Sequence, residues 1–170
     1  MYNIQSLYFI KLYNNSEKTI EITLIESPNI PTIGVGEATV HSVRNYFAAM
    51  GLDEKELLRE TNATLKTGIM FRQWMKPNSD GSTHEYFHSF EQQNIARVLD
   101  ISSAWVVDKR FEKERYDEAI SISSHLIKDG LSPKNANSRP YEGVVPYGYH
   151  LDAIKMANFM AKKGVAAGIK

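Results

Sequence analysis

The first 30 residues contain a predicted helix followed closely by a predicted strand, and this order constrains the fold more than any other feature. Apolar residues at mostly helical spacing predict a helix over residues 4–13, which Asn14 and Asn15 end. Residues 19–25 alternate and are rich in β-branched side chains, which predicts a strand that Pro28 stops. A helix followed by a strand is the second half of a βαβ unit, so an α/β fold is expected.

Two glycines separated by one residue, Gly34 and Gly36, follow the predicted strand. Because glycine has no Cβ, the backbone there can pass close to a flat or charged ligand. The stretch continues toward a predicted helix with Glu37, Ala38 and Thr39. It is not a dinucleotide fingerprint, since it has no third glycine and Pro31 interrupts the strand that should precede it. From the residues alone an ordinary turn is favoured over a ligand-binding loop.

Two charged residues are candidates for a site. Glu26 ends the predicted strand, where an acidic residue of a nucleotide-binding βαβ unit accepts hydrogen bonds from ribose hydroxyls; a solvated carboxylate is an equally good interpretation. Lys66 lies among small residues beside an apolar predicted strand. A lysine held in a dry pocket has a lowered pKa and can act as a nucleophile or hydrogen-bond donor. Spacing alone favours a surface lysine.

Residues 86–90 alternate in a way that predicts Tyr86, His88 and Phe90 on one face of an extended segment. Three rings on one face can sandwich a planar aromatic substrate, although a core strand with one histidine is the favoured interpretation. His84 and His88 have the spacing of metal ligands on a helix. Because the segment looks extended and no third ligand stands nearby in the sequence, no metal site is expected.

Further helices and strands are predicted along the rest of the chain. A helix over residues 43–50 should end at Gly51, and one over 53–61 should begin at Asp53, with Glu56 as capping-box partner. The other predicted segments are a strand over 67–74, a polar turn over 77–83, a helix over 92–99, an irregular stretch over 131–140 and a helix over 150–163 that Gly164 ends. Residues 147–153 suggest packing, with Asp152 as a possible helix cap.

Composition excludes several classes of function. The 170 residues contain 20 Lys+Arg and 20 Asp+Glu, so no overall charge draws the chain to nucleic acid or to a membrane surface. The absence of cysteine rules out disulfides and thiolate metal sites. The sequence has no apolar run of the length that a membrane span needs and no recognisable signal peptide. A soluble, cytoplasmic protein is expected.

Several stretches together resemble the flavin-dependent tryptophan halogenases, in that family's order along the chain. The matching segments are ITLIES (22–27), IPTIGVGEATV (30–40), ETNATLKTGIMF with Trp74 (60–71), YFHSF (86–90) and GYHLDA (148–153). The resemblance implies a Rossmann-like FAD-binding module of a flavin monooxygenase, divided into a partial FAD-binding region (1–61), a substrate-side region (62–146) and a return helix toward the FAD-binding region (147–170). It outweighs the interpretations of Lys66 and of the glycines that spacing alone favours.

The resemblance also implies a reaction. In the family, reduced flavin, supplied by a separate flavin reductase, and oxygen oxidise chloride or bromide to hypohalous acid. The acid moves through a tunnel to a lysine, which presents it to an aromatic carbon; Lys66 stands at that position, and His88 and Phe90 match substrate-stacking positions. The FAD-binding positions are Glu26 and Ser27 near the adenosine, and Gly36, Glu37, Ala38 and Thr39 near the inner part of the flavin.

Parts of the family pattern have no counterpart in these residues. Neither the GxGxxG turn that grips the flavin phosphates nor the WxWxIP stretch is matched, and His41 stands where the family usually has proline. The chain is therefore expected to be a fragment of a halogenase that acts on tryptophan or a similar aromatic substrate. The alternatives are a remnant or partner-requiring module without activity of its own, and a related flavin monooxygenase that oxygenates instead.

Overall fold

The computed structural model describes residues 4–13, 20–27, 29–30, 36–91, 101–111 and 113–170. They form two compact units. The first unit comprises Met1–Lys66 and Gly148–Lys170, and the second unit comprises Thr67–Tyr147. Helices and strands occur in both, which confirms the expected α/β class. None of the helices among the described residues is long and apolar enough to cross a membrane.

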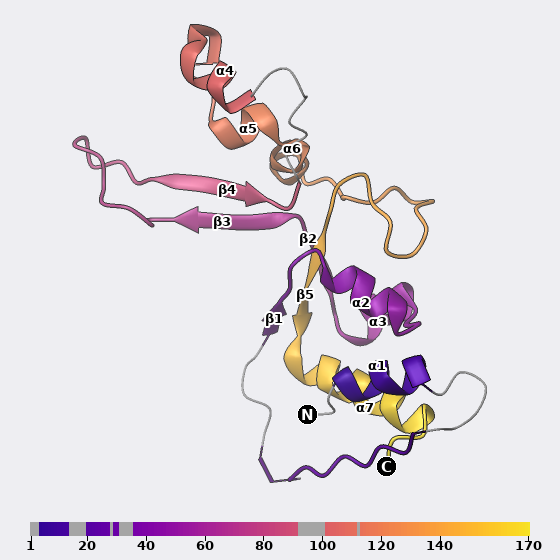
Figure 1. Ribbon diagram of the computed structural model, residues 1–170. Helices are drawn as coiled ribbons and strands as arrows, with labels where there is room; N and C mark the ends of the chain where they lie inside the picture. The colour runs from indigo at the N-terminus through magenta and orange to yellow at the C-terminus, as the bar shows by residue number, and fades with distance from the viewer. Residues whose placement is uncertain (1–3, 14–19, 28, 31–35, 92–100, 112) are drawn as a thin grey trace. The chain divides into compact units, whose positions relative to one another are not determined.

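A three-stranded antiparallel sheet organises the first unit (Figure 1). Strand β5 (Gly148–Asp152) lies at its centre, between β1 (Gly36–Ala38) and β2 (Thr64–Lys66). Glu37 lies opposite Leu151, and Leu65 lies opposite Tyr149. Because side chains alternate along a strand, these four residues share one sheet face, and β5 buries Tyr149 and Leu151 there.

The core of the first unit forms where helices meet that face. The helices are α1 (Ile4–Tyr13), α2 (Val43–Ala49), α3 (Glu54–Glu60) and α7 (Ala153–Ala166). Phe47 of α2 lies with its ring centre 5.9 Å from that of Tyr149. The Tyr149 hydroxyl donates to Glu54 Oε1 at 2.7 Å, so both buried polar groups have a partner.

Two helix ends lie where the sequence predicts them. Asp53 Oδ1 accepts from the Glu56 N–H at 2.7 Å and caps α3 as predicted. Gly51 follows α2 with φ +68°, the left-handed conformation that a C′ glycine supplies. The final helix differs: it begins at Ala153, capped by Asp152, because residues 148–152 pair as β5, and it continues through Gly164.

The strand predicted over residues 19–25 is wrong as a regular element: residues 20–25 are extended but lie outside any assigned strand, and residue 19 lies outside the described residues. Their pairing is confined to one residue, since the Leu24 N–H donates to the Lys170 carbonyl and the Lys170 N–H to that of Ile22. Two such bonds to residues i and i+2 follow the parallel pattern. A regular strand needs consecutive pairs along a ladder, and no strand is assigned to residues 20–25.

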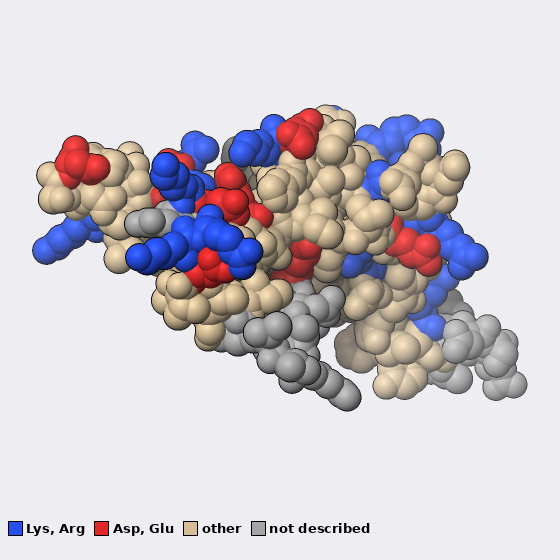
Figure 2. Space-filling view, turned by 90° about the horizontal axis from the view of Figure 1, so that it is seen from above, with Lys and Arg blue, Asp and Glu red and all other residues tan. Residues whose placement is uncertain are grey.

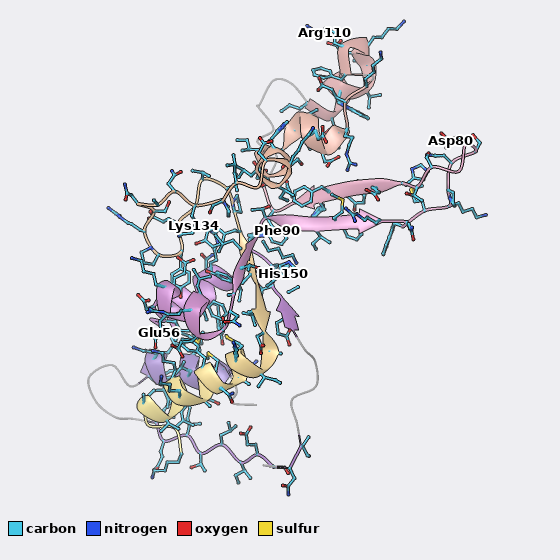
Figure 3. The ribbon with its side chains drawn as sticks, turned by 180° about the vertical axis from the view of Figure 1, so that it is seen from behind. Glu56, Asp80, Phe90, Arg110, Lys134 and His150 are labelled. Carbon is cyan, nitrogen blue, oxygen red and sulfur yellow. The ribbon has the colours of Figure 1, made fainter. Side chains whose placement is uncertain are left out.

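A two-stranded hairpin forms most of one side of the second unit (Figure 1). Strands β3 (Gly68–Arg72) and β4 (Glu85–Ser89) confirm the predicted strand and aromatic segment. Residues 77–83 form the predicted turn, with Gly81 at φ +80° and Asp80 at the tip (Figure 3). Beyond the hairpin come α4 (Ile101–Val107), the 3-10 helix η1 (Lys109–Phe111), α5 (Tyr116–Ile120) and α6 (Ile122–Lys128). The helix predicted over 92–99 lies outside the described residues.

An irregular loop, residues 129–147, ends the second unit, and Lys134 fixes it from within (Figure 3). The Lys134 ammonium donates to the carbonyls of Arg139 at 2.9 Å and Glu142 at 2.6 Å and to the buried Tyr147 hydroxyl at 3.0 Å. This loop contains the stretch over 131–140 that was predicted to be irregular. The Lys134 ammonium thus adds three hydrogen bonds to the backbone turns that the loop already contains.

Candidate functional site

Lys66 is the last residue of β2 and lies opposite Gly148 of β5. Residues directly opposite in an antiparallel pair project to the same sheet face, so Lys66 lies on the face opposite to Tyr149 and Leu151. Lys66 is half-buried, and its cross-strand neighbour has no side chain. The ladder therefore holds the lysine at a fixed place, opposite a residue without a side chain.

Gly148 is needed for a second reason. A Cβ at this residue would meet the carbonyl oxygen and Oγ1 of Thr39 and the carbonyl carbon of Val40, each at 3.0 Å. The segment after β1 therefore crosses β5 at the residue that pairs with Lys66. The structure thus brings two predicted site segments, residues 36–39 and Lys66, to opposite sides of one strand. Strands β1 and β2 lie two strand spacings apart, about 10 Å.

Strand β1 contains three of the predicted cofactor-binding residues, and all three are exposed: Gly36, Glu37 and Ala38. In the described sheet it is an edge strand, with β5 along one side only. The interpretation of these residues as a loop is wrong, because they pair with His150, Leu151 and Asp152. An exposed edge still offers backbone groups along which a flat cofactor can lie.

The Thr39 hydroxyl is engaged in hydrogen bonds within the protein. Its Oγ1 accepts from the Tyr149 N–H at 2.8 Å and donates to the Tyr149 carbonyl at 3.2 Å. Its own N–H donates to the same carbonyl at 2.9 Å. Because that hydroxyl bridges both backbone groups of Tyr149, any contribution of Thr39 to a cofactor site would come from its remaining backbone.

Glu26 and Ser27 lie in the extended segment and are exposed. Ser27 Oγ accepts from the Asn29 N–H at 3.3 Å, a local turn contact. Residues 31–35, which include Gly34, lie outside the described residues. The assignment of Glu26 and Ser27 to the cofactor stays a prediction.

The aromatic residues of β4 do not form one open face. Tyr86 and His88 are exposed, and the Tyr86 ring stacks on Phe71 of β3 with 4.9 Å between ring centres. Phe90, one residue beyond β4, is buried, and its N–H donates to the Thr67 carbonyl at 2.8 Å (Figure 3).

A cavity of about 360 Å³ lies in the second unit between β4 and α5. His88 and Tyr86 line it from the strand, and Tyr116 and Asp117 line it from the helix. The sequence prediction missed Tyr116, Asp117 and Glu91, which also lines the cavity. Only the alternation of residues 86–90 indicated a site in this part of the chain. Helix α5 reaches the cavity by packing against β4, which is distant from it in the sequence.

Electrostatics within the cavity depend on two carboxylates. Burial opposes ionisation of Glu91, but hydrogen bonds from Ser121 Oγ at 2.5 Å and the Ser123 N–H at 2.9 Å outweigh burial and lower its pKa. Asp117 is buried and forms two hydrogen bonds of 3.1 Å with the Arg115 guanidinium. Among the described residues that line the cavity there is no lysine or arginine.

Among the described residues, no group of three or more His, Asp or Glu could hold a metal ion. Over the face seen in Figure 2, lysines and arginines lie among aspartates and glutamates with uncharged side chains between them. This mixture agrees with the equal numbers of both signs in the sequence.

The fold and the candidate site define a class: a partial α/β module in which a lysine lies one strand away from an exposed edge strand. The family model for tryptophan halogenase matches residues 9–170. The chain belongs to the tryptophan halogenase family.

Individual relatives agree with this assignment. The chain is 32% identical over 157 residues to a tryptophan 6-halogenase from Streptomyces albogriseolus and 30% identical over 156 residues to a tryptophan 7-halogenase from Lentzea aerocolonigenes; each match covers 85% of this chain and 29% of the relative. A crystal structure of a tryptophan halogenase from Shewanella frigidimarina aligns with a TM-score of 0.82 and 30% identity, over 96% of this chain and 32% of that protein. The similarity to this crystal structure supports the Rossmann-like fold. The chain spans about a third of the length of these relatives.

Proposed function

We propose that this chain is the part of a flavin-dependent halogenase that holds the catalytic lysine and the first substrate contacts. The observation that carries the proposal is the position of Lys66, opposite Gly148 and one strand away from β1, in a chain of the tryptophan halogenase family. The spacing of about 10 Å between β1 and β2 suits a small oxidant that moves from cofactor to lysine. The substrate is tryptophan or a similar aromatic molecule.

The cofactor would be FAD, reduced by a separate flavin reductase in the cytoplasm. The exposed backbone of Gly36, Glu37 and Ala38 fits a flavin that lies along β1, and Glu26 and Ser27 would lie near its adenosine. Bound reduced FAD would activate oxygen, the oxidant that turns chloride or bromide into hypohalous acid. The Thr39 hydroxyl is engaged by Tyr149, so its role is to hold β1 against β5.

Lys66 would act on the hypohalous acid as a positioned donor. Its ammonium N–H donates a hydrogen bond to the oxygen of the acid and stabilises the negative charge that builds there as the halogen leaves. The aromatic carbon forms a bond to the halogen, the halogen–oxygen bond breaks, and the ring proton and the hydroxide leave as water. A fixed lysine beside a held ring converts an unselective oxidant into local chemistry.

Halogenation assays test the leading proposal. The protein is combined with FAD, a flavin reductase, chloride or bromide and aromatic substrates, and products are detected by mass spectrometry. Lys66→Ala should abolish halogenated product while hypohalous acid still forms, as measured with a chemical trap; Lys155→Ala, an exposed lysine of α7, is the matched control. Halogenation retained by Lys66→Ala would refute the role of the lysine, and oxygenated products would indicate a monooxygenase instead.

A further inference from the structure

The cavity between β4 and α5 has the size and walls of a site for one small aromatic molecule. Its volume of about 360 Å³ lies at the lower end of the range for ligand sites. Tyr86 and His88 line it from β4, and Tyr116 lines it from α5. Trp105 of α4 contacts Tyr116 edge to face with 5.3 Å between ring centres, which fixes the Tyr116 ring from behind.

The charges of the cavity determine which aromatic molecules it can accept. Glu91 and Asp117 line it, and both are held in place, Glu91 by Ser121 and Ser123 and Asp117 by Arg115. Arg115 itself does not line the cavity. Two fixed carboxylates and the Tyr116 ring attract a cation, the carboxylates by charge and the ring by its negative face.

We propose that this cavity binds an aromatic ligand with a positively charged amine and without a carboxylate, of the arylalkylamine class. The inference rests on the proposed function insofar as it takes the cavity that His88 lines as the substrate site, and it narrows the substrate class. A free amino acid would bring its own carboxylate close to Glu91 and Asp117, where like charges repel. A peptide segment or an amine brings no such carboxylate and avoids this repulsion. The small volume of the cavity favours the amine over the peptide.

Direct binding to the full chain tests the proposal without FAD or turnover. Calorimetric or NMR titrations compare four ligands with the same indole ring: tryptamine, tryptophol, tryptophan and indole-3-acetate. Tryptamine should bind about tenfold more tightly than neutral tryptophol, because its ammonium group is attracted by the two carboxylates of the cavity. Tryptophan should bind more weakly than tryptamine, and indole-3-acetate should bind most weakly, because each has a carboxylate that is repelled. Equal affinity for tryptamine and tryptophol, tighter binding of tryptophan, or no binding of any of the four would overturn the proposal.

Variants with opposite expected signs separate a binding role from a structural one. Glu91→Gln keeps an oxygen for Ser121 and Ser123 but removes the charge, so tryptamine affinity should fall about tenfold. Arg115→Gln removes the cation beside Asp117 and should tighten tryptamine binding. Asp80→Asn, at the hairpin tip, is the control and should leave the affinity for tryptamine unchanged (Figure 3). If Glu91→Gln and Arg115→Gln both weaken binding in proportion to a lower melting temperature, the effect is structural and the proposal fails.

The result can be distinguished from failure of the halogenase proposal. Absence of halogenation together with selective tryptamine binding would refute the proposed reaction and leave this site standing. Halogenation of indole-3-acetate in preference to tryptamine would refute the site and leave the reaction standing.

Discussion

The two units of this chain use aromatic residues in opposite ways. In the first unit, Tyr149 and Phe47 are 0% and 1% exposed and pack at the centre of the core beneath β5. In the second unit, Trp74 and Tyr86 are 73% and 47% exposed and lie around Phe71 on one face of the hairpin. Buried rings stabilise a fold, whereas exposed rings on a regular strand are available to a ligand or to another part of a protein.

This difference assigns separate tasks to the units. The first unit is a scaffold, because its central strand fixes both β1 and Lys66 through backbone pairing and has its buried face covered by helices. The second unit offers recognition, because it contains the cavity, the exposed rings and the loop that Lys134 holds. We expect substitutions in the first unit to change stability most and those on the hairpin face to change binding most.

The largest expected effect is on the core of the first unit. Leu57 of α3 is 0% exposed, so Leu57→Ala should lower the free energy of unfolding by about 3 kcal/mol through lost burial and a cavity. Trp74→Ala on the hairpin should change it by less than about 1 kcal/mol, since most of the ring is in contact with water. Urea unfolding followed by circular dichroism measures both. Equal losses would show that the exposed rings also stabilise the fold.

An intermediate effect is expected in the loop of residues 129–147. Lys134→Met removes three hydrogen bonds and leaves the buried Tyr147 hydroxyl without its ammonium partner, so a loss of about 2 kcal/mol is expected. Limited proteolysis should then cut within the loop. Lys128→Met is the control, because its ion pair with Glu118 is exposed and 3.5 Å long. If proteolysis is no faster in Lys134→Met than in Lys128→Met, the lysine does not hold the loop.

Local signals in the sequence were sufficient for the features that depend on near neighbours. The helix over 4–13, the cap at Asp53 and the glycine at Gly51 all depend on residues within one or two turns, and the structure confirms them. The hairpin alternation was equally clear in the sequence. These features need no partner from a distant part of the chain.

Features set by distant pairing could not be predicted in the same way. Strand β5 follows from the pairing of residues 148–152 with β1 and β2, whereas the sequence alone favoured a helix start there. The conformation of residues 20–25 likewise depends on Lys170. In the cavity, Tyr116 and Asp117 reach β4 only because α5 packs against it. The place of Lys66 could be predicted only through the family resemblance, and its role stays a prediction.

The smallest expected effect concerns how the units cap their helices. In the first unit α3 uses its own preceding residue, Asp53, and Asp53→Ala should cost about 1 kcal/mol. In the second unit, Ser121 precedes α6 without forming a side-chain cap, and Glu91, thirty residues earlier, accepts from the Ser123 N–H instead. Glu91→Ala should therefore cost a similar amount, about 1 kcal/mol.

The pH dependence of the unfolding free energy distinguishes the charge of Glu91 from its packing. Because hydrogen bonding lowers the pKa of Glu91 in the folded chain, its ionised form contributes stability above the pKa of an unfolded glutamate, and this contribution is lost as the pH falls through the folded pKa. The difference in unfolding free energy between wild type and Glu91→Gln, measured by urea titrations from pH 7 downward, should thus shrink in acid. A difference that stays constant with pH would mean that Glu91 acts through its shape and not its charge.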